Sequence, residues 1–199
     1  TSKISGLLVA PGEEFSTVAA LGEITEEAGF VKEYVIQQDR TVKELGGGLC
    51  QVATTLFRMA VDSGMPITER VNHKYVIPYY GPGLDATVYE PHPDFRFLND
   101  TGNYILVQGT ADSNEITFEL YGTADGRTAQ VSKPELSNPV PVPPQRNIMT
   151  PDLYVGEVKC ETVTHTGITA DVTYKVSYPD GSEKIQEFHS VYQPWPVVC

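Results

Sequence analysis

One strong helix, in a chain otherwise made of short β-like segments, is the feature that most constrains the fold. Apolar residues recur at helical spacing from Leu49 to Val61, and Gly64 followed by Pro66 is typical of a helix end. Short runs rich in β-branched and aromatic residues follow: KYVIPYY (74–80), ATVYE (86–90), DFRFLN (94–99), NYILVQGT (103–110) and EITFELYG (115–122). The pattern predicts an α+β fold in which one principal helix, starting near Cys50, packs on short, mostly antiparallel strands.

Composition changes along the chain suggest three parts. Residues 1–123 hold the helix and most of the β-like runs and are expected to form a core. Prolines gather in KPELSNPVPVPPQ, so residues 124–151 are expected to form a linker or wrapping arm. Residues 152–199 contain two alternating runs around Pro-Asp-Gly-Ser, which predict a hairpin in a small β unit packed on the core.

The charge balance excludes one class of partner. The 199 residues contain 14 Lys and Arg against 26 Asp and Glu, a formal net charge of −12. Such a chain repels the phosphates of nucleic acids and anionic membrane surfaces. The sequence also lacks a run of about 20 apolar residues. We therefore expect no nucleic-acid partner, membrane contact only through a region outside these residues, and a monomer.

The three cysteines divide into one isolated residue and two near the end of the chain. Cys160 and Cys199 share the C-terminal segment, where a disulfide between them would tie the chain end to the body. The alternative is two ordinary reduced thiols. In either case Cys50 is expected to be free.

Cys50 follows three glycines and lies in the first turn of the predicted helix. The partial positive charge and unpaired N–H groups of a helix start favour a thiolate, and the same groups can hold an oxyanion. Gly47 and Gly48 allow a peptide to approach closely, and they are candidate substrate-binding residues together with Gln51. These features make Cys50 a candidate nucleophile. The alternative is a small buried core residue.

A nucleophilic cysteine needs a base, and His73 is the candidate. It lies 23 positions after Cys50, next to a predicted strand that would bring it back beside the helix start. Asp85, Glu69 or Asp94 could orient its ring. The alternative is a structural histidine held by hydrogen bonds. His92 is expected in a loop, and His165 and His189 at surface or hairpin positions.

Two arginines and a possible metal site complete the candidates. Arg70 and Arg96 are candidates for binding a substrate carboxylate, against the alternative of surface ion pairs. A zinc site would need Cys50, His73, Asp85 and His92, but the sequence lacks the close ligand pairs typical of such sites. It also lacks a phosphate-binding loop, a dinucleotide fingerprint and a GxSxG elbow. No metal and no cofactor are expected.

These motifs together resemble the VanW-type domain family. The resemblance is carried by PGEEFS, GGGLCQVATTLFRMA, ERVNHKYVIPYYGPGLDATV, DFRFLN and YILV, and it extends to the C-terminal VSYPDGSEKIQEFHSVYQPWP. It covers most of the chain and is weakest across the proline-rich segment. One departure is Lys74, where members often have serine.

The resemblance implies an exported or membrane-anchored protein of the cell envelope, with residues 1–123 as the catalytic core. Some members act as L,D-transpeptidases, which implies that Cys50 is the nucleophile, His73 the base and Asp85 the orienting acid. The partners are then peptidoglycan stem peptides, joined into 3-3 cross-links through a cysteine thioester. Two alternatives remain open: a cysteine peptidase on the same stem peptides, and a non-catalytic module that binds the cell wall.

Overall fold

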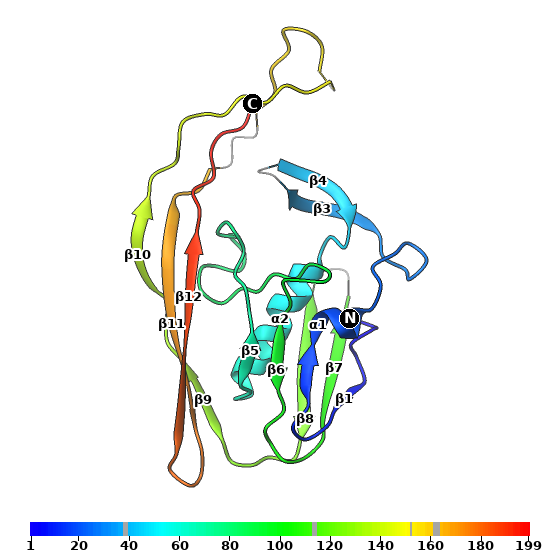
Figure 1. The fold of residues 1–199 in the computed structure, drawn as a ribbon, viewed down its shortest axis with the longest axis vertical. Coiled ribbons are helices and arrows are strands. Elements are labelled where there is room, and N and C mark those ends of the chain that lie inside the picture. The colour runs from blue at the N-terminus through cyan, green and yellow to red at the C-terminus, as the bar shows by residue number, and fades with distance from the viewer. Residues whose placement is uncertain (38–39, 113–114, 152, 161–163) are drawn as a thin grey trace.

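The computed structural model describes residues 1–37, 40–112, 115–151, 153–160 and 164–199. Within these residues the chain forms two helices and twelve strands (Figure 1). The helices are α1 (Thr17–Leu21) and α2 (Leu49–Asp62). The strands are β1 (Leu7–Val9), β2 (Glu14–Ser16), β3 (Lys32–Gln37), β4 (Arg40–Leu45), β5 (Ile67–Glu69), β6 (Arg96–Leu98), β7 (Ile105–Ala111), β8 (Ile116–Gly122), β9 (Thr128–Val131), β10 (Glu135–Val140), β11 (Gly167–Ser177) and β12 (Glu183–Tyr192). The α+β class predicted from the sequence is confirmed.

The strands form several small antiparallel sheets rather than one large one. Three sheets have the orders β1-β7-β8, β2-β6-β5 and β3-β4. The fourth has the order β10-β11-β12, with β9 also paired to β11. In Figure 1 this fourth sheet runs along one side of α2, and the β1-β7-β8 sheet lies on the other side. The helix therefore occupies the centre of the molecule.

Helix α2 runs from Leu49 to Asp62, close to the limits that its apolar spacing predicts. One face is buried in the core: Val52, Ala53, Leu56, Phe57, Met59, Ala60 and Val61. The Phe57 ring meets the edges of Phe95 and Phe188, at centroid distances of 5.7 and 5.1 Å. The helix thus joins residues from the middle and the C-terminal part of the chain. No helix in the described part of the chain is long and apolar enough to cross a membrane.

Two predicted strands are wrong: residues 74–80 and 86–90 are not strands in the structure. Side chains of α2 bind part of their backbone instead, and loop backbone groups bind others, such as the Val71 carbonyl that accepts from the Thr87 N–H. The Thr54 hydroxyl accepts from the Ala86 N–H and donates to the Ala86 carbonyl, both at 3.0 Å. Arg58 donates to the carbonyls of Tyr80 and Leu84 at 2.6 and 2.9 Å. Because these groups replace a neighbouring strand, the β-like composition does not lead to sheet pairing here.

The hairpin predicted around residues 179–182 is confirmed. Strands β11 and β12 pair without a break from Ile168 opposite Tyr192 to Ser177 opposite Glu183. One face of this hairpin enters the core, where Val172, Tyr174 and Phe188 are buried. The C-terminal hairpin and α2 therefore share one apolar core.

The proline-rich segment supplies strands to the same sheet. Residues 124–151 contain β9 and β10, and both pair with β11 on the side opposite β12. Pro139 lies in β10 where the register shifts between Ser137 and Val140, and every residue of β10 is exposed. An edge strand tolerates proline because it needs N–H groups on only one side. The division of the chain into three parts stays a prediction.

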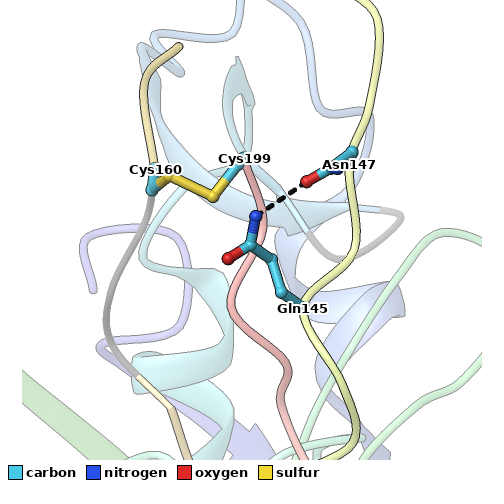
Figure 2. The surroundings of a disulfide bond; sticks show 4 residues. All are labelled: Gln145, Asn147, Cys160 and Cys199. Atoms are coloured by element: carbon cyan, nitrogen blue, oxygen red, sulfur yellow. Dashed lines mark hydrogen bonds between the residues drawn. A yellow bond between two sulfur atoms is a disulfide. The ribbon is translucent and has the colours of Figure 1, made fainter.

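A disulfide joins Cys160 to Cys199, as the first of the two cysteine alternatives predicted (Figure 2). The end of the chain runs beside residues 146–148. The Arg146 N–H donates to the Val197 carbonyl at 2.8 Å, and the Cys199 N–H donates to the Arg146 carbonyl at 2.9 Å. Nearby, the Gln145 side-chain amide donates a hydrogen bond of 2.8 Å to the Asn147 side chain (Figure 2). The chain end is therefore held by both covalent and backbone contacts.

Candidate active site

Cys50 is the second residue of α2 and opens onto a pocket of about 640 Å³. It is the free cysteine of the three and is half-buried, so its sulfur faces the pocket rather than the core. The Sγ atom lies 3.2 Å from Thr87 Oγ1 and 3.8 Å from the Val88 carbonyl oxygen. The predicted position in the first helical turn is confirmed.

The three glycines before Cys50 form a tight turn. Gly46 and Gly48 have φ angles of 89° and 88°, which side chains disfavour. At Gly47 a Cβ atom would lie 2.1 Å from the Cβ of Glu33 in β3, so only glycine fits there. The turn thus lets β3 pack directly against the start of α2, and no side chain caps that helix start.

Most backbone N–H groups in the first turn of α2 already donate hydrogen bonds to carbonyls. Leu49 donates to the Gly46 carbonyl and Gln51 to the Gly48 carbonyl, each at 3.1 Å. The Cys50 N–H donates to no backbone carbonyl among the described residues. It is therefore a candidate donor to an oxyanion that develops next to the sulfur.

His73 contacts both Cys50 and Asp85. Its Nδ1 lies 2.6 Å from Asp85 Oδ2, and the same oxygen accepts the His73 backbone N–H at 2.8 Å. The His73 side chain also lies beside Cys50 in the same pocket, close enough for each group to shift the pKa of the other. Because Nδ1 faces Asp85, Nε2 is the ring nitrogen left for the sulfur. The structure therefore brings together the three residues that the sequence analysis paired, although no strand follows His73.

Asp85 is buried, with 1% of its surface exposed. Oδ1 accepts a hydrogen bond from Arg70 Nη2 at 3.1 Å and another from the Tyr192 hydroxyl. Among the described residues, Oδ2 accepts hydrogen bonds from His73 alone. This division of the two oxygens fixes which face of the carboxylate meets the imidazole.

The three groups shift one another's pKa in the directions that an ion pair requires. Burial raises the pKa of Cys50, but contacts with His73, Thr87 and the Val88 carbonyl outweigh it, and the net pKa is lowered. Burial lowers the pKa of His73, but hydrogen bonds and charges from Asp85 and Cys50 raise it to about 9. Burial raises the pKa of Asp85, but its donors, His73 first, lower it overall. These shifts keep His73 protonated and Asp85 ionised at neutral pH, and they favour the thiolate of Cys50 relative to an ordinary thiol.

The pocket has an aromatic and acidic lining. Its lining residues are Ile24, Glu44, Leu45, Gly46, Gly48, Leu49, Cys50, Gln51, His73, Ile77, Tyr79, Tyr80, Thr87, Val88, Tyr89 and Glu90. Neither lysine nor arginine occurs among these described residues. Thr87 and Tyr80 were missed by the sequence analysis, because nothing in their type or spacing distinguishes them from ordinary loop residues.

The predicted substrate-binding residues separate into two groups. Gly48 and Gln51 line the pocket, whereas Gly47 faces Glu33 and lies outside the lining. Arg70 has a side chain only 5% exposed. Besides binding Asp85, it donates to the carbonyls of Asp85 and Gly83 and to the Ser190 hydroxyl. Its placement favours holding Asp85 over direct contact with a substrate.

Arg96 lies away from the pocket, in an ionic cluster near α1. Its guanidinium contacts Asp94 and Glu69 at 2.9 and 3.3 Å and Glu14 at 3.1 Å. Asp94 accepts the Val18 N–H at the start of α1. Since Asp94 and Glu69 are engaged here, Asp85 is the predicted acid that the structure brings to His73.

The remaining histidines lie elsewhere. His92 Nδ1 pairs with Glu69 at 2.9 Å, so it is not part of the Cys50 group that the zinc alternative required. The backbone of His165 forms an isolated antiparallel β-bridge with Trp195, and His189 lies in β12. The described residues contain no group of three or more His, Cys, Asp and Glu side chains able to hold a metal ion.

Comparison with known proteins adds a family and two relatives. Residues 1–121 match the family model described as VanW like protein. The uncharacterized protein YoaR of Bacillus subtilis is 34% identical over 120 residues, which are 60% of this chain and 40% of YoaR. The vancomycin B-type resistance protein VanW of Enterococcus faecalis is 26% identical over 124 residues, 59% of this chain and 45% of that protein. The matched region thus spans less than half of each relative. No solved structure gave a significant match.

Proposed function

The chain belongs to the VanW-like family, and from the contacts of Cys50, His73 and Asp85 we propose that it is a peptidoglycan L,D-transpeptidase of the bacterial cell envelope. The observation that carries this proposal is the placement of His73 between a free thiol and a buried carboxylate at the wall of a pocket. A nucleophile, a base and a group that orients the base are what acyl transfer requires. The family membership directs this chemistry toward the cell wall.

The first half-reaction forms a thioester. The Cys50 thiolate attacks the carbonyl carbon of the third residue in a tetrapeptide stem, and the peptide bond to D-alanine breaks. The His73 imidazolium gives its proton to the departing D-alanine amine. The Cys50 N–H and the side-chain amide of Gln51, which lines the pocket, stabilise the oxyanion that develops during attack.

The second half-reaction uses an amine. The side-chain amine of a third residue on a neighbouring stem attacks the thioester carbonyl, and neutral His73 takes its proton. A new amide forms the 3-3 cross-link, and Cys50 leaves as the thiolate, which restores its pair with the His73 imidazolium. Glu44 and Glu90 support an amine-bearing partner, because both acidic side chains line the pocket and its described lining contains no lysine or arginine.

The disulfide supports placement outside the cytoplasm. Disulfides persist in oxidising compartments and are rare where thioredoxin and glutathione keep thiols reduced. The bond between Cys160 and Cys199 therefore favours the exported location in which peptidoglycan is found.

Product masses from purified tetrapeptide-rich muropeptides test this function. We expect cross-linked dimers that have lost one D-alanine, and no such dimers with Cys50→Ser, whose hydroxyl is nearly the same size but far less ionised. Thermal unfolding of the variant should match that of the wild type. Release of D-alanine with tripeptide monomers would instead identify a peptidase, and binding without turnover would identify a cell-wall-binding module.

A further inference from the structure

Two residues of β12 reach into the candidate active site from the far end of the chain. Resting on the proposed function, we infer that Tyr192 is a positioning residue for the His73–Asp85 pair. The C-terminal sheet then completes an active site whose reacting groups, Cys50 and His73, lie in the family-matched region. That region ends at residue 121. Tyr192 lies 71 positions beyond it and acts through Asp85 rather than on the substrate.

The contacts of Tyr192 carry the inference. Its hydroxyl donates to Asp85 Oδ1 and accepts the Gly83 N–H at 2.7 Å. The residue is 2% exposed, so neither bond competes with bulk water. Burial raises the pKa of Tyr192 to about 12, with the charge of Asp85 adding to the effect, so the hydroxyl keeps its proton and remains a donor.

Ser190 supports the same carboxylate through Arg70. Residues 190 and 192 lie on one face of β12, because alternate side chains of a strand point the same way. The Ser190 hydroxyl accepts from Arg70 Nη1 at 2.7 Å, while Nη2 of the same guanidinium binds Asp85 Oδ1. Both interactions with Oδ1 therefore depend on β12.

The backbone around His73 is also attached to this end of β12. The Asn72 side-chain amide donates to the Val191 carbonyl at 3.1 Å, and the Gln193 N–H donates to the Lys74 carbonyl at 2.8 Å. Residues 71–76 belong to neither helix nor strand. Contacts with residues 191 and 193 on either side of Tyr192 thus set the path of the segment that carries His73.

The physical role follows from the two oxygens of Asp85. Oδ2 must face His73 Nδ1 for Nε2 to point at the sulfur, and the donors on Oδ1 fix this orientation together with the His73 backbone N–H on Oδ2. Loss of the Tyr192 hydroxyl leaves Arg70 alone on Oδ1. The ring of His73 then pairs less often with Cys50, and a smaller fraction of the thiol is ionised near neutral pH.

Alkylation of Cys50 by iodoacetamide measures this effect without a peptidoglycan substrate. With the Cys160–Cys199 disulfide intact, Cys50 is the free thiol, so the reagent reports on one site. We expect Tyr192→Phe to lower the alkylation rate below pH 7 by about three- to tenfold and to move the midpoint of its pH profile upward. Turnover should fall by a similar factor.

Tyr174→Phe is the matched control. Tyr174 is a buried tyrosine of the same sheet, and its hydroxyl donates to the Met65 carbonyl at 3.0 Å, away from the pocket. This variant removes an equivalent hydrogen bond and should leave the alkylation profile within twofold of the wild type. An equal loss in both variants would show that the sheet acts on general stability alone, which overturns the inference.

A double variant tests whether Tyr192 acts through Asp85. In an Asp85→Asn background, adding Tyr192→Phe should change the alkylation rate by less than twofold. A full additional effect, or no effect of Tyr192→Phe on the wild type, would refute the positioning role. Should Tyr192→Phe not fold, Ser190→Ala gives the same comparison with an expected two- to threefold loss. If alkylation responds as expected while muropeptides are not cross-linked, the positioning role stands and the transpeptidase proposal fails.

Discussion

Two histidine–aspartate pairs in this molecule have the same Nδ1–Oδ distance, 2.6 Å, in very different surroundings. The His73 and Asp85 side chains are 15% and 2% exposed, and His73 also contacts a thiol. His189 and Asp171 face each other across β11 and β12 with side chains 65% and 45% exposed. Water screens the second pair, so it contributes little beyond cross-strand pairing.

The two pairs show that the distance between a histidine and a carboxylate does not by itself identify a catalytic base. What differs is the group on the other side of the ring and the burial of the pair. Burial by itself lowers the pKa of the His73 imidazole, but the hydrogen bonds and charges of Asp85 and Cys50 outweigh it and raise the pKa to about 9. Substitutions made in parallel at the two pairs can therefore separate function from surface pairing.

The largest expected difference is between the two histidines. His73→Gln should lower transpeptidation turnover by roughly 10²- to 10⁴-fold, because the proton donor and acceptor of both half-reactions is lost. His189→Gln should leave turnover within twofold. Steady-state assays on tetrapeptide muropeptides measure both. Equal turnover of the two variants would remove His73 from the mechanism.

A smaller difference is expected between the two aspartates. Asp85→Asn should lower turnover by about 10- to 100-fold, since a hydrogen bond to a charged group is lost while Cys50 and His73 remain. Asp171→Asn should have no measurable effect on turnover, because its pair is largely exposed. Wild-type turnover in both variants, each shown by circular dichroism to be folded, would contradict the assigned role of Asp85.

The pH dependence of turnover should shift when the buried pair is changed and stay the same when the exposed pair is changed. Turnover should rise with pH as Cys50 ionises, at a pH below that of an ordinary thiol, and fall again near pH 9 as His73 loses the proton that D-alanine needs. In Asp85→Asn the falling limb should move to lower pH, because Asp85 raises the pKa of His73. Asp171→Asn should keep the wild-type profile. An unmoved falling limb in Asp85→Asn would argue against the assigned role of the carboxylate.

The smallest expected effect on turnover comes from the disulfide that holds the end of the sheet. Cys160 and Cys199 lie 39 positions apart, and replacing both with alanine should reduce the free energy of unfolding by about 2–4 kcal/mol. Turnover of the folded double variant should fall by no more than about threefold, because backbone hydrogen bonds still hold the chain end. Denaturant unfolding measures the first quantity. An unchanged denaturant midpoint would show that the backbone hydrogen bonds hold the chain end equally well without the disulfide.

Helix α2 and the site at its start could be predicted because their signals are local. The apolar spacing of residues 49–61, the glycines before Cys50 and the turn at residues 179–182 each determine nearby structure. Order and residue type indicate His73 as the partner of Cys50 but leave Asp85, Glu69 and Asp94 open, and the family resemblance is what favours Asp85. The structure places Asp85 in contact with His73, beside Cys50.

The supporting contacts could not be predicted, because they join residues far apart in the sequence. Nothing local in residues 74–80 indicates that Arg58 takes the place of a neighbouring strand. Nothing in β12 indicates that Tyr192 meets Asp85, 107 positions earlier. Arg70 resembles a surface arginine in the sequence, and only the packing of β12 over it explains its burial. Such long-range polar contacts leave no periodic pattern in one sequence.

Intact-protein mass spectrometry tests the central claim most directly. The protein is mixed briefly with a tetrapeptide muropeptide lacking any amine acceptor and is then acidified. The account predicts a covalent adduct on Cys50 equal to the muropeptide minus D-alanine, released by hydroxylamine as a thioester is, and absent from Cys50→Ser. Loss of D-alanine from the muropeptide without an adduct on Cys50, or with the same adduct in Cys50→Ser, would contradict the claim that this thiol carries the acyl group.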